Sequence, residues 1–203
     1  MISKLSNRIT QKLLKRNVIP EEDQELYAYG LFMIISYSAF FLIAIVFGVI
    51  LNIAFSSIIF FISFCLIRNY AGGIHANSEI KCSIITTLSI LISEILIRIF
   101  IDYCLVWAAF VMLIISSICL TAIKPVAASQ KEISAQERFN YHKKVILLTF
   151  SALIISIVGI VLPIHNVTIS LSIGLSLASV LLVVGKINHI KSGMACDRSQ
   201  LDF

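Results

Sequence analysis

Two long stretches of the chain contain no charged residue, and their lengths predict pairs of membrane-spanning helices. From Leu26 to Ile67 there are 42 residues without Asp, Glu, Lys or Arg. Because a helix crosses the hydrocarbon core with about 20 apolar residues, this stretch predicts two spans, with a tight turn near Gly48 and Asn52. The stretch from Val145 to Gly185 has 41 such residues and predicts two more spans, separated at Pro163, His165 and Asn166.

Shorter apolar runs and one amphipathic pattern complete the predicted architecture. One run begins after Cys82 and ends near Ile101, and another extends from Tyr103 to Ile123. The fold class that follows is an all-α integral membrane protein with about six transmembrane helices. Ahead of the first span, apolar residues recur at helical spacing among basic ones. This pattern predicts an amphipathic helix on the inner leaflet, with an apolar face formed by Ile2, Leu5, Ile9 and Leu13.

The basic residues indicate how the spans are oriented. All 16 Lys and Arg residues except Arg98 lie before the first span, after the last one, or in two of the connections, at residues 68–81 and 124–144. Because basic residues concentrate on the cytoplasmic side of a membrane, we expect both termini in the cytoplasm. The expected domains are an amphipathic helix and linker (1–25), a six-helix transmembrane domain (26–185) and a cytoplasmic tail (186–203).

Composition agrees with this architecture and excludes other classes of protein. The chain of 203 residues is 59% hydrophobic and 13% charged, with a mean hydropathy of +0.98, whereas soluble domains carry about 25% charged residues. An ordinary cytosolic enzyme, a secreted module and a disordered chain are therefore excluded. The net charge of +5 indicates topology and some attraction to anionic lipid. Nucleic acid is not an expected partner, because no basic patch is interleaved with base-stacking aromatic residues.

The connection between the second and third spans contains the densest set of reactive side chains. It extends from Arg68 to Cys82 and places His75 seven residues before Cys82, a combination that suits attack by a thiolate with histidine as base. On one straight helix these two residues would lie about 10.5 Å apart, too far for a hydrogen bond. Turn and cap residues predict instead a helix that begins close to Cys82 and a loop that carries His75, with the turn at Gly72-Gly73 and the caps at Asn77 and Ser78.

Structural interpretations stay open for these residues and for the polar residues inside the spans. If these two residues have only a structural role, Cys82 is a small apolar residue at the membrane edge and His75 lies on a loop surface.

Glu94 and Arg98 are four apart in the third span, so we expect them to form an ion pair within one helix, with a mainly structural role. Two stripes of small residues are typical of helix-packing seams, although the first would also suit a substrate groove: Thr86, Ser89 and Ser93 on the Cys82 face, and Ser170, Gly174 and Ala178. The scattered histidines and the lack of a His-Glu-x-x-His motif argue against a metal, and no cofactor is expected.

The segment from Arg68 to Cys82 resembles the signature of the accessory gene regulator B family, in which an Arg and a Gly-Gly pair precede a His and, seven residues later, a Cys. The segment that begins Lys124-Pro125-Val126 and ends at Lys131 resembles the family's second recognisable segment. The resemblance implies a bacterial membrane endopeptidase of quorum sensing. Such enzymes cut a small amphipathic propeptide of accessory gene regulator D (AgrD) type, remove its acidic C-terminal tail and close the new C-terminus into a thiolactone or lactone.

The same resemblance implies roles for individual residues. Cys82 would be the nucleophile that forms an acyl-thioester and His75 the general base, with supporting motif positions at Arg68, Gly72, Gly73 and Asn77. The basic connection at 124–144 would hold the acidic tail electrostatically, through Lys124, Lys131, Lys143 and Lys144. A simple positive-inside loop is the alternative for that connection. The protein would lie in the plasma membrane with its active site on the cytoplasmic side.

Two other classes of function stay open. A small-molecule or peptide transporter would have Glu94 and Arg98 in its pathway, and a non-catalytic scaffold would need neither chemistry. A transporter should tolerate Cys82→Ser and lose function with Glu94→Gln, whereas the peptidase predicts the reverse. The small size of the chain favours self-association, and a homodimer is compatible with the sequence without being fixed by it.

Overall fold

The computed structural model describes residues 2–16, 18–71, 79–123 and 135–201, with side chains throughout except at 2, 4, 21, 79–82, 135–138 and 188–201. Across these ranges the chain is helical and contains no strand. A short 3-10 turn, η1 (Glu21–Asp23), separates the first two α-helices. The α-helices are α1 (Ile2–Lys15), α2 (Gln24–Ile50), α3 (Ala54–Ala71), α4 (Glu79–Asp102), α5 (Val106–Ala122), α6 (Ala135–Val161) and α7 (His165–Leu201).

Most of these helices are long and apolar enough to cross a membrane. Among the described residues, five candidate spans lie in α2, α3, α4, α6 and α7, and α5 is an apolar helix of 17 residues that is slightly shorter than the others. Apolar side chains cover much of the outside, with Ile34, Leu147 and Val161 each more than half exposed. An apolar exterior is what lipid tails require of a protein surface. The structure therefore confirms the all-helical membrane fold that the charge-free stretches predict.

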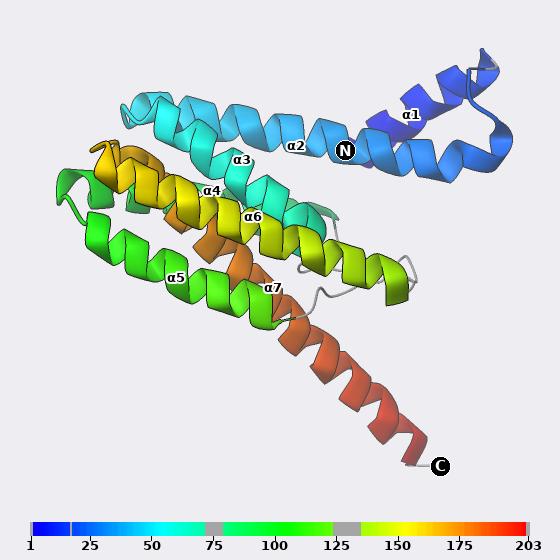
Figure 1. Ribbon diagram of the computed structural model, residues 1–203. Coiled ribbons are helices and arrows are strands. Elements are labelled where there is room, and N and C mark those ends of the chain that lie inside the picture. Colours follow the sequence, from blue (N-terminus) through cyan, green and yellow to red (C-terminus); the bar gives the residue numbers. More distant parts are fainter. Residues whose placement is uncertain (1, 17, 72–78, 124–134, 202–203) are drawn as a thin grey trace.

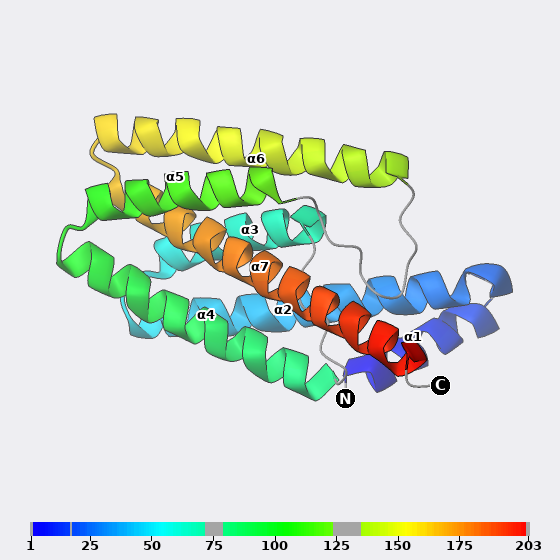
Figure 2. The same ribbon diagram turned by 90° about the horizontal axis from the view of Figure 1, so that it is seen from below.

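Short turns join the helices at one end of the bundle (Figure 1). The α2–α3 turn lies where the sequence predicts it, with Asn52 at a φ of 57° and the Ile53 N–H donating to the Gly48 carbonyl at 2.7 Å. Residues 103–105 and 162–164 form the α4–α5 and α6–α7 turns, and a second view places all three turns at the same end (Figure 2). The helices from α2 to α7 thus alternate in direction.

The helix α7 lies at the centre of the packing. It contacts α3, α4, α5 and α6, and two-thirds of the residues in its most apolar part are buried. Gly174 of α7 lies so close to α3 that a Cβ atom at this position would be 3.0 Å from the Phe60 carbonyl oxygen. The predicted seam of Ser170, Gly174 and Ala178 is therefore confirmed as a packing surface. Further along the helix, Ser176 shares a 2.8 Å hydrogen bond with Ser116 of α5.

The amphipathic helix α1 folds back against the first turns of α2. Small polar side chains of α1 form part of this contact. Ser6 and Thr10 are buried, and the Ser6 hydroxyl donates to the Ala28 carbonyl. The basic side chains of Arg8 and Lys12 are exposed, as an interfacial helix requires. The helix itself is confirmed, and its location on the inner leaflet stays a prediction.

Two helices extend beyond the apolar stretches that predict them. The apolar stretch begins at Val145, but α6 begins at Ala135. The expected basic connection at 124–144 therefore ends in about three turns of helix. At the other end of the chain, α7 continues past Gly185 as far as Leu201 (Figure 1).

Candidate active site

The structure describes only part of the predicted site. Arg68, Lys143 and Lys144 are described with their side chains, and Cys82 is described by its place in α4. Outside the described residues lie His75, Gly72, Gly73, Asn77, Lys124 and Lys131. The contact between Cys82 and His75 therefore stays a prediction, and the site is built below from the helices around it.

Cys82 lies in the first turn of α4. The described helix begins at Glu79, directly after the predicted cap residues, so Cys82 is its fourth residue. Backbone N–H groups in the first turn of a helix have no partner within the helix, and the helix dipole is positive at this end. A thiolate at this position would be stabilised by both effects.

Arg68 lies in the last turn of α3, where a cation is favourable for the helix dipole. Its guanidinium carbon is 5.6 Å from the centre of the Phe64 ring, and its Nη1 donates to Thr86 Oγ1 across 3.5 Å. Thr86 follows Cys82 by four residues on α4, and residues with this spacing share a helix face. The motif arginine is therefore directed at the face of α4 that carries Cys82, one helical turn away.

Two further contacts hold the end of α3 in place. The hydroxyl of Tyr37, on α2, donates to Asn69 Oδ1 at 2.7 Å. On the other side, the ring of Tyr70 lies 6.0 Å from the ring of Tyr141 on α6, with the planes inclined at 49°. The end of α3, which contains the first residues of the motif segment, is thus fixed between α2 and α6.

The two described lysines of the basic connection occupy different surroundings. Lys144 Nζ lies 4.9 Å from the centre of the Tyr70 ring and 6.0 Å from that of Tyr141. Lys143 Nζ lies 4.4 Å from the Phe139 ring, which belongs to the same helix. Only Lys144 of this pair is therefore placed against the predicted motif segment, through a cation–π contact.

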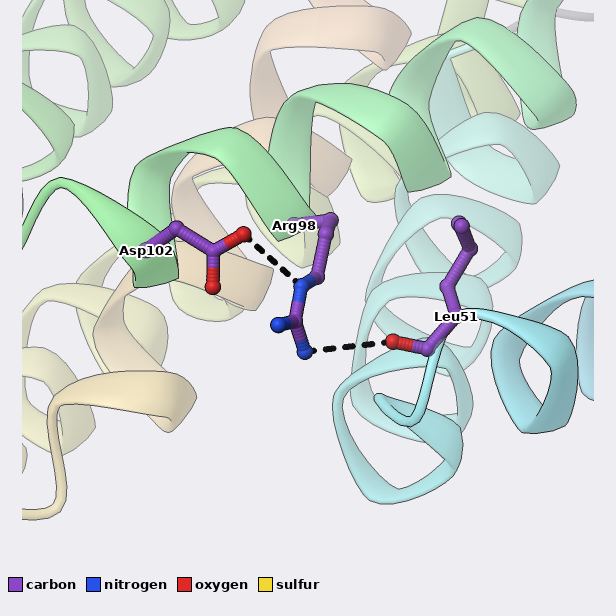
Figure 3. Close-up of polar contacts among 3 residues, drawn as sticks. All are labelled: Leu51, Arg98 and Asp102. Atoms are coloured by element: carbon purple, nitrogen blue, oxygen red, sulfur yellow. Dashed lines mark hydrogen bonds and ion pairs between the residues drawn. The ribbon is translucent and has the colours of Figure 1, made fainter.

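The predicted ion pair between Glu94 and Arg98 is wrong. Arg98 instead donates through Nε to Asp102 Oδ2 at 2.9 Å and through Nη1 to the Leu51 carbonyl at 3.2 Å (Figure 3). Leu51 caps the C-terminus of α2, where carbonyl groups lack helical partners and the dipole attracts a cation. These two acceptors outcompete Glu94 for the guanidinium. Glu94 is completely buried, and its Oε2 lies 2.5 Å from Ser57 Oγ on α3.

Sequence reasoning missed the aromatic residues around Lys144. Tyr70 belongs to the motif segment, and Tyr141 precedes Lys144 by three residues. A spacing of three indicates a shared face only on a helix, and the sequence assigned this region to a connection rather than to α6. In the described part of the chain, no group of three or more His, Cys, Asp or Glu residues lies together in a way that would hold a metal ion.

Comparison with known proteins identifies a family and individual proteins with similar sequences. Residues 6–184 match the family described as Accessory gene regulator B (AgrB). Two proteins of Clostridium perfringens that are named AgrB-like are 31% and 30% identical to the chain over 93 residues, in strains SM101 and 13 respectively. The matched region covers 46% of this chain and 42% of each relative, so the chain spans less than half of their length. No solved structure matches the chain significantly.

Proposed function

The chain belongs to the Accessory gene regulator B family, and we propose that it is a membrane cysteine endopeptidase that processes a quorum-sensing precursor peptide of AgrD type. The observation that carries this proposal is the position of Arg68 against the Cys82 face of α4, in the first turn of which Cys82 lies. Both residues match the motif through which the sequence resembles the family. The helix terminus supplies the electrostatic environment that a thiolate nucleophile needs.

The reaction follows from the chemistry of a cysteine and a histidine. His75 accepts the proton of Cys82, and the thiolate sulfur attacks the scissile carbonyl carbon of the precursor. The carbon–nitrogen bond then breaks, and His75 returns the proton to the departing amine of the C-terminal tail. The remaining peptide is held on Cys82 as a thioester. A thiol or hydroxyl within the peptide attacks this thioester, releases the ring as a thiolactone or lactone and regenerates the Cys82 thiol.

Lys144 is the residue that we assign to the precursor's acidic tail. Its side chain is exposed, and its ammonium group lies against the ring of Tyr70, one residue before α3 ends at Ala71. A carboxylate of the tail bound there would neutralise the cation beside the reaction centre. Lys124, Lys131 and Lys143 would add to the positive potential of the same region.

The topology belongs to the same proposal. We assign six crossings, with α5 as the shortest, both termini in the cytoplasm and the ends of α3 and α4 that carry the motif on the cytoplasmic side. The positive-inside pattern supports this orientation, because the basic residues lie almost entirely on that side. A homodimer, which the small size of the chain favours, is part of the proposal as well.

Mass spectrometry of reconstituted protein with a precursor peptide of AgrD type tests the proposal. Wild-type protein in proteoliposomes should shorten and cyclise the precursor and carry a covalent adduct on Cys82. Cys82→Ala should abolish cleavage completely, because no other group replaces the nucleophile. Cys104→Ala is the matched control, since Cys104 is exposed in the turn between α4 and α5, at the opposite end of the bundle. Equal processing by wild type and Cys82→Ala would contradict the proposal.

One observation supports a transporter as the second candidate function. Glu94 is a completely buried carboxyl group inside a candidate span, and ionisable groups in such positions frequently mark transport pathways. A transporter would lose transport with Glu94→Gln and keep it with Cys82→Ser. The peptidase would lose cleavage with Cys82→Ser and keep it with Glu94→Gln.

A further inference from the structure

Glu94 is a buried acid that the proposed reaction does not use. Its side chain has no exposed surface, its Oε2 lies 2.5 Å from Ser57 Oγ, and its Oε1 has no hydrogen-bond partner in the described part of the chain. It lies 12 residues after Cys82 on α4, which is about 18 Å along the helix. Glu94 therefore cannot touch the reacting atoms, and another role must account for it.

The number of hydrogens available at this contact indicates the protonation state of Glu94. Ser57 has one hydroxyl hydrogen, but its Oγ is close to two acceptors, the Ile53 carbonyl at 3.1 Å and Glu94 Oε2 at 2.5 Å. With an ionised Glu94, one of these contacts would have no hydrogen. With a neutral Glu94, the carboxylic acid donates to Ser57 Oγ and Ser57 donates to the Ile53 carbonyl, so both contacts are satisfied.

The surroundings of Glu94 also favour the neutral form. The nearest cation on its own helix, Arg98, is bound to Asp102 and to the Leu51 carbonyl. In the described part of the chain, the one ion pair is that between Arg98 and Asp102. An ionised, unpaired carboxylate would be strongly unfavourable in such a buried position.

Ser57 also packs closely on α2. A Cβ atom at Gly48 would overlap with Ser57 Oγ, and it would lie 2.7 Å from Ser57 Cβ and 3.3 Å from the Ala54 Cα. The backbone of α2 therefore packs directly on the Ser57 side chain. This close approach leaves the Ser57 hydroxyl, which contacts Glu94, little room to move.

Among the described side chains, the Ser57–Glu94 contact is one of two direct polar links between α3 and α4. Within the described residues, these helices do not pack closely on each other, and both pack on α2 and α7 instead. The second link is the contact between Arg68 and Thr86 near the candidate active site. We propose that Glu94 is a protonated carboxylic acid that clamps α4 to α3, and that this clamp positions the end of α4 that carries Cys82. The positioning of Cys82 rests on the proposed function, whereas the contact between Glu94 and Ser57 is independent of it.

Infrared spectroscopy of the full chain in lipid nanodiscs tests the clamp without any substrate. At neutral pH the wild-type protein should show a carbonyl band of a protonated carboxylic acid. Glu94→Gln should remove this band, and Ser57→Ala should shift it, because the acid loses its acceptor. Asp102→Asn is the matched control and should leave the band unchanged, since Asp102 is ion-paired and exposed. A wild-type spectrum without the band, or a band that persists in Glu94→Gln, would overturn the clamp.

Cleavage kinetics test the positioning role. Glu94→Gln should keep kcat within about twofold, because its amide N–H can donate to Ser57 Oγ as the acid does. Glu94→Ala and Ser57→Ala should lower kcat about three- to twentyfold with KM unchanged, the range expected for one interhelical hydrogen bond in a membrane. Loss of cleavage in Glu94→Gln, or unchanged kcat in Ser57→Ala, would overturn the positioning role. If wild type cleaves no precursor, the proposed function fails while the infrared result still decides the clamp.

Discussion

Lys143 and Lys144 are neighbours in the sequence, but the structure places them in different surroundings. Lys144 contacts Tyr70 of the motif segment, whereas Lys143 contacts Phe139 of its own helix. We expect Lys144→Gln to raise the KM for the precursor about three- to fivefold, the upper part of the range for one solvent-exposed charge pair. Lys143→Gln is the matched control and should change KM less. Measurement at low and high salt completes the test, because a screened charge interaction weakens with salt. Equal effects of both substitutions would refute the assignment of Lys144.

The partners of individual side chains could not be predicted from the sequence. The spacing of Glu94 and Arg98 permits an ion pair, but the free carbonyl of Leu51 and the carboxylate of Asp102 compete for the same guanidinium. No pattern within α4 reveals the Leu51 carbonyl, because it comes from a turn 47 residues earlier in the chain. Arg68 was predictable as a motif residue, whereas its partner Thr86 depends on how α3 and α4 are placed relative to each other.

At the scale of helices, the packing of α7 on α3 depends on a residue without a side chain. A Cβ at Gly174 would lie 3.0 Å from the Phe60 carbonyl oxygen and 3.4 Å from the Phe64 nitrogen, and neither backbone atom can move freely. We therefore expect Gly174→Ala to destabilise the protein by about 1–3 kcal/mol, as overpacking does. Thermal unfolding in detergent measures this as a lower Tm.

The control for Gly174 is a glycine in open surroundings. Gly30 of α2 has no atom within 4 Å of its hypothetical Cβ. Because alanine favours a helix over glycine by about 1 kcal/mol, Gly30→Ala should leave the Tm unchanged or raise it. A fall in Tm of equal size for both variants would contradict the role of close packing at Gly174, because a Cβ at Gly30 meets no neighbouring atom.

The helices themselves were largely predictable, and the reason is physical. Inside a bilayer every backbone polar group needs a hydrogen-bond partner within the protein. A long charge-free stretch that crosses the bilayer therefore forms a helix, which satisfies these groups within the segment itself. This rule no longer applies outside the hydrocarbon core. The polar first ten residues of α6, from Ala135 to Lys144, and the extension of α7 beyond Gly185 carry no such signal. Their helical structure depends instead on continuation from the adjoining span and on local contacts such as that of Tyr141 with Tyr70.

At the scale of the whole molecule, the contact between Lys144 and Tyr70 bears on the number of membrane crossings. These residues lie at the end of α3 and near the start of α6, so both must be on the same side of the membrane. Since α4 and α5 lie between them in the chain, these two helices must cross the membrane an even number of times. If the candidate span in α4 crosses once, α5 must cross as well. The contact therefore supports the six crossings that we propose.

The length of α5 makes this conclusion testable. Its 17 residues extend about 25 Å, less than the hydrocarbon core of about 30 Å, so the crossing requires local thinning of the bilayer. With six crossings, both termini lie on one side. Green fluorescent protein fused to either terminus should therefore fluoresce in the cytoplasm, and alkaline phosphatase fused within the α4–α5 turn should be active outside. Phosphatase activity at the C-terminus would instead mean that α5 does not cross. Lys144 would then lie on the opposite side from Cys82, and its assignment to the acidic tail would fail together with the six-span topology.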